Sequence, residues 1–179
     1  MSRFSGRLSL MMIILCTGIV SSQLRSTFTY EEKPVLEWSD FTGEIPANAR
    51  HMASANTGLG YEVVNANIDN ITKPEIQVNA IFYASLSWKK ELPSYSEPLL
   101  QHEQLHFLIT ELHARKLRKA YSYYRPVKNV KQEVDYIYRK FENDRLKMQA
   151  AYDRETGHGN DKNKQRDWEI FVNSELFKL

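Results

Sequence analysis

The chain has 179 residues, of which 42% are hydrophobic and 12% aromatic, enough for one domain with a hydrophobic core. Its formal net charge is only +2 at pH 7, which argues against an electrostatic nucleic-acid binder. The sequence has no internal repeats and no long low-complexity segment, so we expect a single globular unit.

The N-terminus has the pattern of a secretory signal. Arg3 and Arg7 precede a mostly apolar run at residues 8–20, which is short for a membrane span. We therefore predict a signal peptide at residues 1–22, cleaved before Gln23. The mature protein would be secreted or periplasmic, with no stable membrane insertion after cleavage.

Two alternatives to simple cleavage stay open: an uncleaved anchor, and lipidation of Cys16. Lipidation is disfavoured because Leu15 stands where a small residue is preferred. Cys16 is the only cysteine, so the mature chain would have neither disulfides nor thiolate ligands. Any metal site would then use His, Asp or Glu, a donor set that suits a catalytic zinc better than a structural one.

The first half of the mature chain reads as strands and turns. Residues 23–34 are polar and predict a flexible lead-in, and residues 35–41 predict a short first strand. Residues 50–68 predict two strands or one bent strand, with Gly58 and Gly60 at a turn or bulge.

The clearest strand signal follows a predicted turn region at residues 65–74. Apolar and polar residues alternate over residues 75–89, which predicts a half-buried strand. The length of this segment predicts a bend or a hairpin.

Helical patterns dominate the second half. A helix is predicted from about Glu97 to Tyr121, with Ser94 or Ser96 as its N-cap. A second helix is predicted at about residues 127–152, a glycine-containing loop at residues 152–159, and a last helix at about residues 161–176. The expected fold class is therefore α+β, with strands in the first half of the mature chain and three helices after them.

The first helix contains His-Glu-x-x-His at residues 102–106. Residues four apart share one face of a helix, so His102 and His106 can offer two imidazole nitrogens to one metal ion. Glu103 lies beside them, where a carboxylate can act as general base. This pattern indicates a zinc hydrolase, most often a peptidase.

A catalytic zinc usually has a third protein ligand. Glu111 lies on the wrong side of the helix, and His113 lies about 10 Å along its axis, too far to share the ion. If the two long helices form an antiparallel hairpin, the loop after the second helix folds back onto the metal. His158 is then the preferred third ligand, Asp153 the alternative and Glu155 the next.

Three segments together carry a resemblance to a known family. They are Trp38-Ser39-Asp40-Phe41-Thr42-Gly43, the motif helix from His102 to Arg115, and Tyr152-Asp153-Arg154-Glu155-Thr156-Gly157-His158-Gly159. Over most of residues 35–178 the chain resembles a group of predicted secreted zinc-dependent proteases, largely a domain family of unknown function. The resemblance implies a zincin-like fold at residues 35–179, with an N-terminal, mostly antiparallel sheet packed on the motif helix and two further helices after it. It leaves the third ligand open.

The expected function is zinc-dependent hydrolysis of a peptide or protein substrate, with Zn²⁺ held by His102, His106 and His158 and with Glu103 as base. Tyr152 or His113 would stabilise the oxyanion. The zincin resemblance further implies that the strand edge near Trp88 would bind an extended peptide. The alternatives are a non-catalytic metal-containing envelope or extracellular binding protein, and a zinc amidase acting on cell-wall material. The sequence does not predict an oligomeric state.

Overall fold

A computed structural model describes residues 26–65, 74–91 and 96–179, and it confirms the α+β class. The predicted signal peptide and most of the predicted turn at residues 65–74 lie outside these ranges. No helix in the described part of the chain is long and apolar enough to cross a membrane. The elements in chain order are β1 (Phe28–Thr29), the 3-10 helix Trp38–Asp40, β2 (Ala53–Ser54), β3 (Thr57–Asn65), β4 (Glu75–Phe82), β5 (Trp88–Lys89), α1 (Glu97–Tyr123), α2 (Val130–Thr156) and α3 (Lys162–Phe177).

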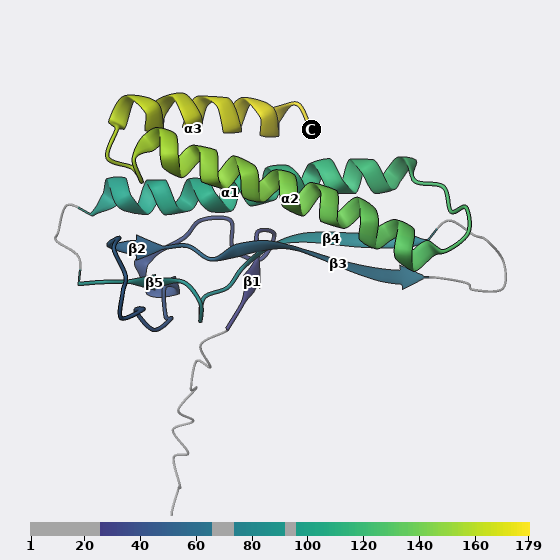
Figure 1. The fold of residues 1–179 in the computed structure, drawn as a ribbon, viewed down its shortest axis with the longest axis horizontal. Coiled ribbons are helices and arrows are strands. Elements are labelled where there is room, and N and C mark those ends of the chain that lie inside the picture. Colours follow the sequence, from purple (N-terminus) through teal and green to yellow (C-terminus); the bar gives the residue numbers. More distant parts are fainter. Residues whose placement is uncertain (1–25, 66–73, 92–95) are drawn as a thin grey trace, which may run out of the picture.

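Two small antiparallel sheets make up the first half (Figure 1). One has the strand order β1-β4-β3, and the other pairs β2 with β5. Helix α1 packs on the larger sheet, while α2 and α3 pack on α1 and on each other. The two long helices form the predicted antiparallel hairpin, with Tyr152 of α2 donating a 3.2 Å hydrogen bond to the carbonyl of His102 in α1.

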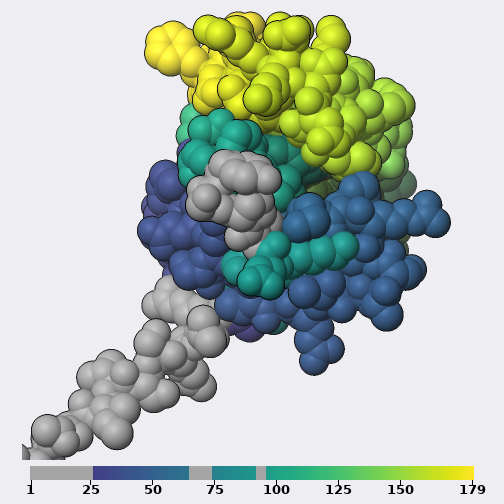
Figure 2. Space-filling view, turned by 90° about the vertical axis from the view of Figure 1, so that its left-hand side faces the viewer, coloured from purple at the N-terminus to yellow at the C-terminus, as the bar shows by residue number. Residues whose placement is uncertain are grey.

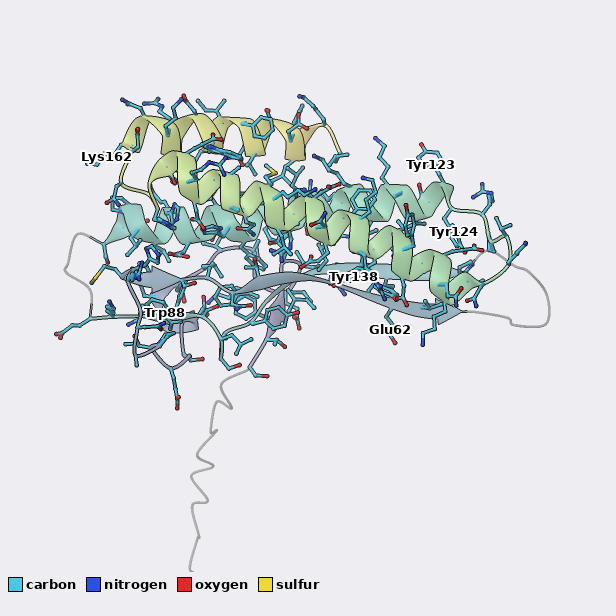
Figure 3. All side chains as sticks on the ribbon, in the orientation of Figure 1. Glu62, Trp88, Tyr123, Tyr124, Tyr138 and Lys162 are labelled. Atoms are coloured by element: carbon cyan, nitrogen blue, oxygen red, sulfur yellow. The ribbon has the colours of Figure 1, made fainter. Side chains whose placement is uncertain are left out.

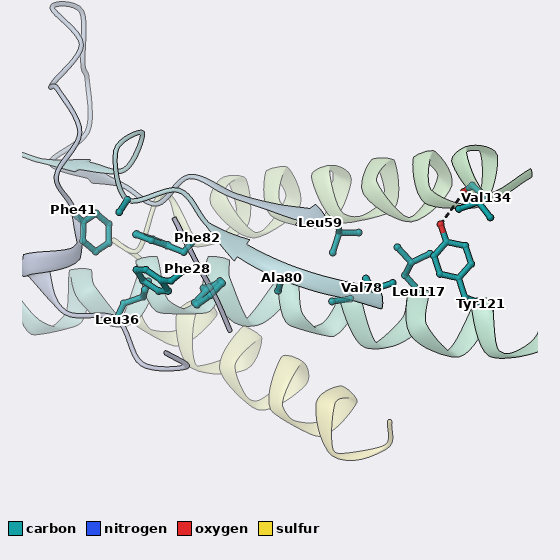
Figure 4. Packing of buried hydrophobic residues seen from close by; sticks show 13 residues of the cluster. Phe28, Leu36, Phe41, Leu59, Val78, Ala80, Phe82, Leu117, Tyr121 and Val134 are labelled. Carbon is teal, nitrogen blue, oxygen red and sulfur yellow. Dashed lines mark hydrogen bonds between the residues drawn. The ribbon is translucent and has the colours of Figure 1, made fainter. Parts of the chain in front are cut away.

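Helix α1 is buried on two sides. Toward the sheet, Phe107 packs with Phe28 and Phe82, whose ring centroids lie 6.1 and 5.7 Å away. Figure 4 shows Phe28 and Phe82 among the other buried residues of this cluster. Toward α2 and α3, Leu105 and Ile109 belong to a second apolar cluster. The motif helix is therefore packed between the sheet and the other two helices, which fixes the position of its backbone.

Three local predictions were wrong. Residues 35–41 form no strand; they contain the 3-10 helix, where Asp40 accepts a 2.7 Å hydrogen bond from the backbone N–H of Glu37. Gly58 and Gly60 lie inside β3 rather than at a turn, because cross-strand side chains cover them: a Cβ on Gly60 would lie 2.5 Å from Ile81 Cδ1.

The third correction concerns the predicted loop at residues 152–159. Helix α2 continues through Thr156 and ends at Gly157, which takes the left-handed conformation with φ of 56°. Asp153 is therefore a helical residue, which fixes the direction of its side chain.

Two other predicted segments contain more structure than the patterns indicated. The predicted flexible lead-in contains β1, and Phe28 is buried. The predicted strand at residues 75–89 bends between β4 and β5, as its length indicated. The bend exposes Leu86 and buries Ser87, so both side chains lie opposite to the alternation pattern.

Candidate metal centre

The His-Glu-x-x-His motif lies in the N-terminal half of α1, with all three side chains buried. His102, Glu103 and His106 are 2%, 3% and 8% exposed. The Nε2 atoms of the two histidines lie 3.3 Å apart. The helix therefore brings two imidazole nitrogens together, as the four-residue spacing predicted.

Asp153 of α2 completes a group of three possible ligands. Its Oδ1 lies 3.0 Å from His106 Nε2 and 3.3 Å from His102 Nε2. With metal–ligand bonds of about 2.0–2.1 Å, ligand atoms around a tetrahedral zinc lie about 3.3–3.4 Å apart. Two of the three observed distances, at 3.3 Å, match the edges of such a tetrahedron, and the third, at 3.0 Å, is slightly shorter, so these residues fit a zinc ion after a small adjustment. Among the His, Cys, Asp and Glu residues that the structure describes, His102, His106 and Asp153 form the group whose ligand atoms are close enough together to hold one metal ion.

Two glutamine amides contact the histidines at Nδ1, the ring nitrogen that does not face Asp153. His106 Nδ1 hydrogen-bonds to Gln149 Oε1, and His102 Nδ1 lies 3.2 Å from Gln165 Oε1. Gln149 Nε2 donates a 2.9 Å hydrogen bond to the backbone carbonyl of His106, so the amide oxygen of Gln149 must face the imidazole. Both histidines can then donate a proton from Nδ1 to a glutamine oxygen, which leaves Nε2 as the nitrogen that faces Asp153 and that a metal ion can bind.

The charges at this site already favour a cation. Burial opposes ionisation of His106, but the hydrogen bond to Asp153 and the charge of Glu103 outweigh it, so the pKa of His106 is raised. Burial of Asp153 likewise disfavours its anion, but hydrogen bonds from His102 and His106 hold its pKa well below the usual range. Asp153 is therefore ionised at neutral pH, and a metal ion can replace the shared proton.

His158, the preferred third ligand from sequence, lies next to this group rather than inside it. Its Nδ1 is 3.4 Å from Asp153 Oδ1, and its ring centroid is 4.0 Å from that of His51. It has a positive φ of 55° between Gly157 and Gly159. The geometry favours Asp153, the alternative, as third ligand, and a ligand role for His158 stays a prediction.

A cleft of about 1040 Å³ opens beside the group and runs between α2 and the segment that contains β2 and β3. Glu103 and His158 line it, and so do Lys162 and Tyr138, which Figure 3 labels. Figure 2 looks onto the end of the molecule where the β2 segment, in blue, meets α2 and α3, in yellow-green. The metal group is thus reachable from a cleft large enough for a segment of polypeptide.

Other candidate residues lie outside the cleft. Tyr152 is fully buried, and its hydroxyl donates to Gln165 and to the His102 carbonyl. His113 Nδ1 donates 2.9 Å to the carbonyl of Ile109, and Glu111 pairs with arginines of its own helix. None of the three lines the cleft, so the geometry does not support Tyr152 or His113 as an oxyanion donor.

Residues 45–159 match a family model described as a bacterial protein of unknown function, DUF922. The chain belongs to the DUF922 family. Searches of the curated proteins and of the solved structures found no match. The DUF922 description states neither protease activity nor zinc dependence, so the family membership alone assigns no reaction.

The DUF922 match includes His102, Glu103, His106, Asp153 and His158, but it ends before α3. Sequence reasoning missed Gln149 and Gln165. Gln149 precedes Asp153 by one helical turn, so a search for hydrogen-bonding residues on that face of α2 would have found it. Gln165 gives no such signal, because only the packing of α3 on α1 brings it to His102.

Proposed function

We propose that this DUF922 protein is a secreted or periplasmic zinc-dependent peptidase with a zincin-like arrangement. The observation that carries the proposal is the tetrahedral spacing of His102, His106 and Asp153 beside Glu103 in one cleft. Two histidines and one carboxylate form a known ligand set for catalytic zinc, which leaves a position for water.

A zinc ion held there would lower the pKa of a water molecule and polarise the scissile carbonyl. Glu103 accepts a proton from the attacking water and then delivers it to the departing amine. The carboxylate is suited to this because its Oε2 is fixed by the backbone N–H of Ala55 and the residue lines the cleft.

The strand beside the site supports a peptide as the substrate of this proposal. The sequence placed the peptide-binding edge near Trp88, but Trp88 belongs to β5, which pairs with β2. It is β2 that lines the cleft. An extended peptide can therefore hydrogen-bond along β2 and pass the metal group, with its scissile bond near Glu103.

The test combines metal analysis with hydrolysis of a peptide library followed by mass spectrometry. We expect one zinc ion per chain at neutral pH and a fall in kcat of roughly 10²–10⁴-fold for Glu103→Gln. Glu97→Gln is the matched control, because Glu97 lies exposed in the first turn of the same helix and outside the cleft.

Each contrary outcome has a separate meaning. Failure to bind stoichiometric metal contradicts the proposed metal centre. Bound metal without hydrolysis of any substrate supports the non-catalytic binding protein. Release of products from cell-wall material but not from peptides supports the amidase.

A further inference from the structure

Helix α3 reaches the metal centre although it lies beyond the DUF922 match. Its residue Gln165 is buried, with 8% of its surface exposed, and contacts the Nδ1 side of the His102 ring. Gln165 Oε1 lies 3.2 Å from His102 Nδ1 and accepts a 2.6 Å hydrogen bond from the hydroxyl of Tyr152. One amide oxygen therefore connects three helices at this point.

The orientation of the Gln165 amide is fixed by its other end. Gln165 Nε2 donates 2.9 Å to Glu169 Oε1, one turn further along α3. An ionised carboxylate accepts hydrogen bonds but cannot donate them. The amide nitrogen must therefore face Glu169, and the amide oxygen must face His102. His102 then keeps its proton on Nδ1, and its Nε2 is free to bind a metal ion.

Tyr152 makes this contact rigid. Its ring stacks on the imidazole of His102, with centroids 4.6 Å apart and an angle of 25° between the planes. Trp168 of α3 also packs against Tyr152, at a centroid distance of 5.5 Å and an angle of 61° between the planes. The position of the His102 ring is thus determined by residues that α3 holds in place.

We propose that α3 completes the metal centre, with Gln165 as a positioning residue that fixes the proton and the ring orientation of His102. This inference rests on the proposed metal centre, but it does not need the centre to be a peptidase. Loss of a residue that supports a metal-binding histidine typically weakens metal affinity about 10–100-fold.

The first test replaces Gln165 by leucine. In Gln165→Leu the Tyr152 hydroxyl keeps the His102 carbonyl as an acceptor, so the fold keeps its buried hydrogen bond there. The imidazole loses its acceptor at Nδ1, and part of the population moves its proton to Nε2, where it blocks the metal. We expect zinc affinity to fall about 10–100-fold in competition with a chromophoric chelator. Asn173→Ala, an exposed change on the same helix, should leave the affinity unchanged.

The second test exchanges the amide and the carboxylate on α3. In the double variant Gln165→Glu with Glu169→Gln, the hydrogen bond between the two positions is kept with its direction reversed. A carboxylate then faces His102 Nδ1, which makes the imidazole a stronger ligand. We expect tighter zinc binding than in wild type by at least threefold, whereas Glu169→Gln alone, which no longer fixes the direction of the Gln165 amide, should not tighten it.

A purely structural role for Gln165 predicts a different result. The thermal midpoint of the metal-free protein would fall in Gln165→Leu, while its increase on zinc addition would match wild type. That result, or unchanged zinc affinity in both Gln165 variants, overturns the inference while leaving the metal centre intact. A wild-type protein that binds no zinc contradicts the metal centre itself and, with it, this role of Gln165.

Discussion

Glu103 on α1 accepts a 2.7 Å hydrogen bond from the backbone N–H of Ala55, in the connection between β2 and β3. The proposed general base is thereby tied to the segment that lines the cleft, and one of its two oxygens is held in place. The same bond stabilises the packing of this segment on α1, so Glu103 has a structural role as well as a chemical one.

The two roles of Glu103 can be separated by comparing Glu103→Gln with Glu103→Ala. Both variants should lose hydrolysis, because neither side chain accepts a proton. A glutamine oxygen can still accept the Ala55 N–H, whereas alanine leaves that group without its partner at a cost of about 1–3 kcal/mol. Chemical denaturation should therefore show a lower unfolding free energy for Glu103→Ala than for Glu103→Gln. Equal stability would contradict the structural role.

The third metal ligand can be identified by substituting each candidate in turn. Asp153→Asn should weaken zinc binding more than about 100-fold, because it removes the negative charge of the oxygen that lies 3.0 and 3.3 Å from the two histidine nitrogens. His158→Ala should weaken zinc binding less than about tenfold, because its Nδ1 contacts Asp153 rather than the two histidines. Isothermal titration with zinc measures both values. The opposite order would show that His158 is the ligand, as the sequence alone suggested.

Gly159 and Gly157 offer a matched pair for testing how the loop after α2 supports the site. Both have positive φ, 79° and 56°, so alanine at either position should lower stability by about 1–2 kcal/mol. A Cβ on Gly159 would also lie 3.0 Å from His102 Cγ, whereas at Gly157 its nearest neighbour is Asn160 Cβ, 3.9 Å away. Only Gly159→Ala should therefore reduce zinc affinity. A similar loss in Gly157→Ala would show that backbone strain, and not the contact with His102, is responsible.

The turn between α1 and α2 should make stability depend on pH. Glu133 accepts hydrogen bonds from the hydroxyl of Tyr124 and from the backbone N–H groups of Val127, Lys128 and Asn129. These bonds lower the pKa of Glu133 from 4.5 to about 2. Because the folded-state pKa is depressed, the stabilisation is complete above the ordinary value and is lost as the pH falls from 4.5 toward about 2.

Glu133→Gln should therefore have a lower thermal midpoint than wild type at pH 7, and the difference should shrink below pH 4.5. Tyr124→Phe removes the hydrogen bond that contributes most to the shift, so the pKa of Glu133 should rise toward its usual range. Thermal unfolding from neutral to acidic pH measures the first effect, and carboxyl NMR titration the second. A constant difference between Glu133→Gln and wild type at all pH values would contradict this account.

Local patterns in the sequence predicted a large part of this molecule. The period of apolar residues gave the three helices and the β4 strand, since that period is set by backbone geometry alone. The spacing of His102 and His106 predicted their shared face for the same reason. The predictions of short elements were wrong where a local hydrogen bond, as at Asp40, or a cross-strand contact, as at Gly60, decided the backbone conformation.

The sequence by itself determined that two histidines and a glutamate lie together on one helix, because these residues are within one turn of each other. It could not decide between Asp153 and His158, since the choice depends on where α2 ends and on the direction of each side chain from the backbone. Nor could it identify Gln165, which lies 63 positions from His102 in the chain. Only the packing of α2 and α3 on α1 brings these groups within hydrogen-bonding distance, because such contacts depend on three-dimensional position and not on sequence spacing.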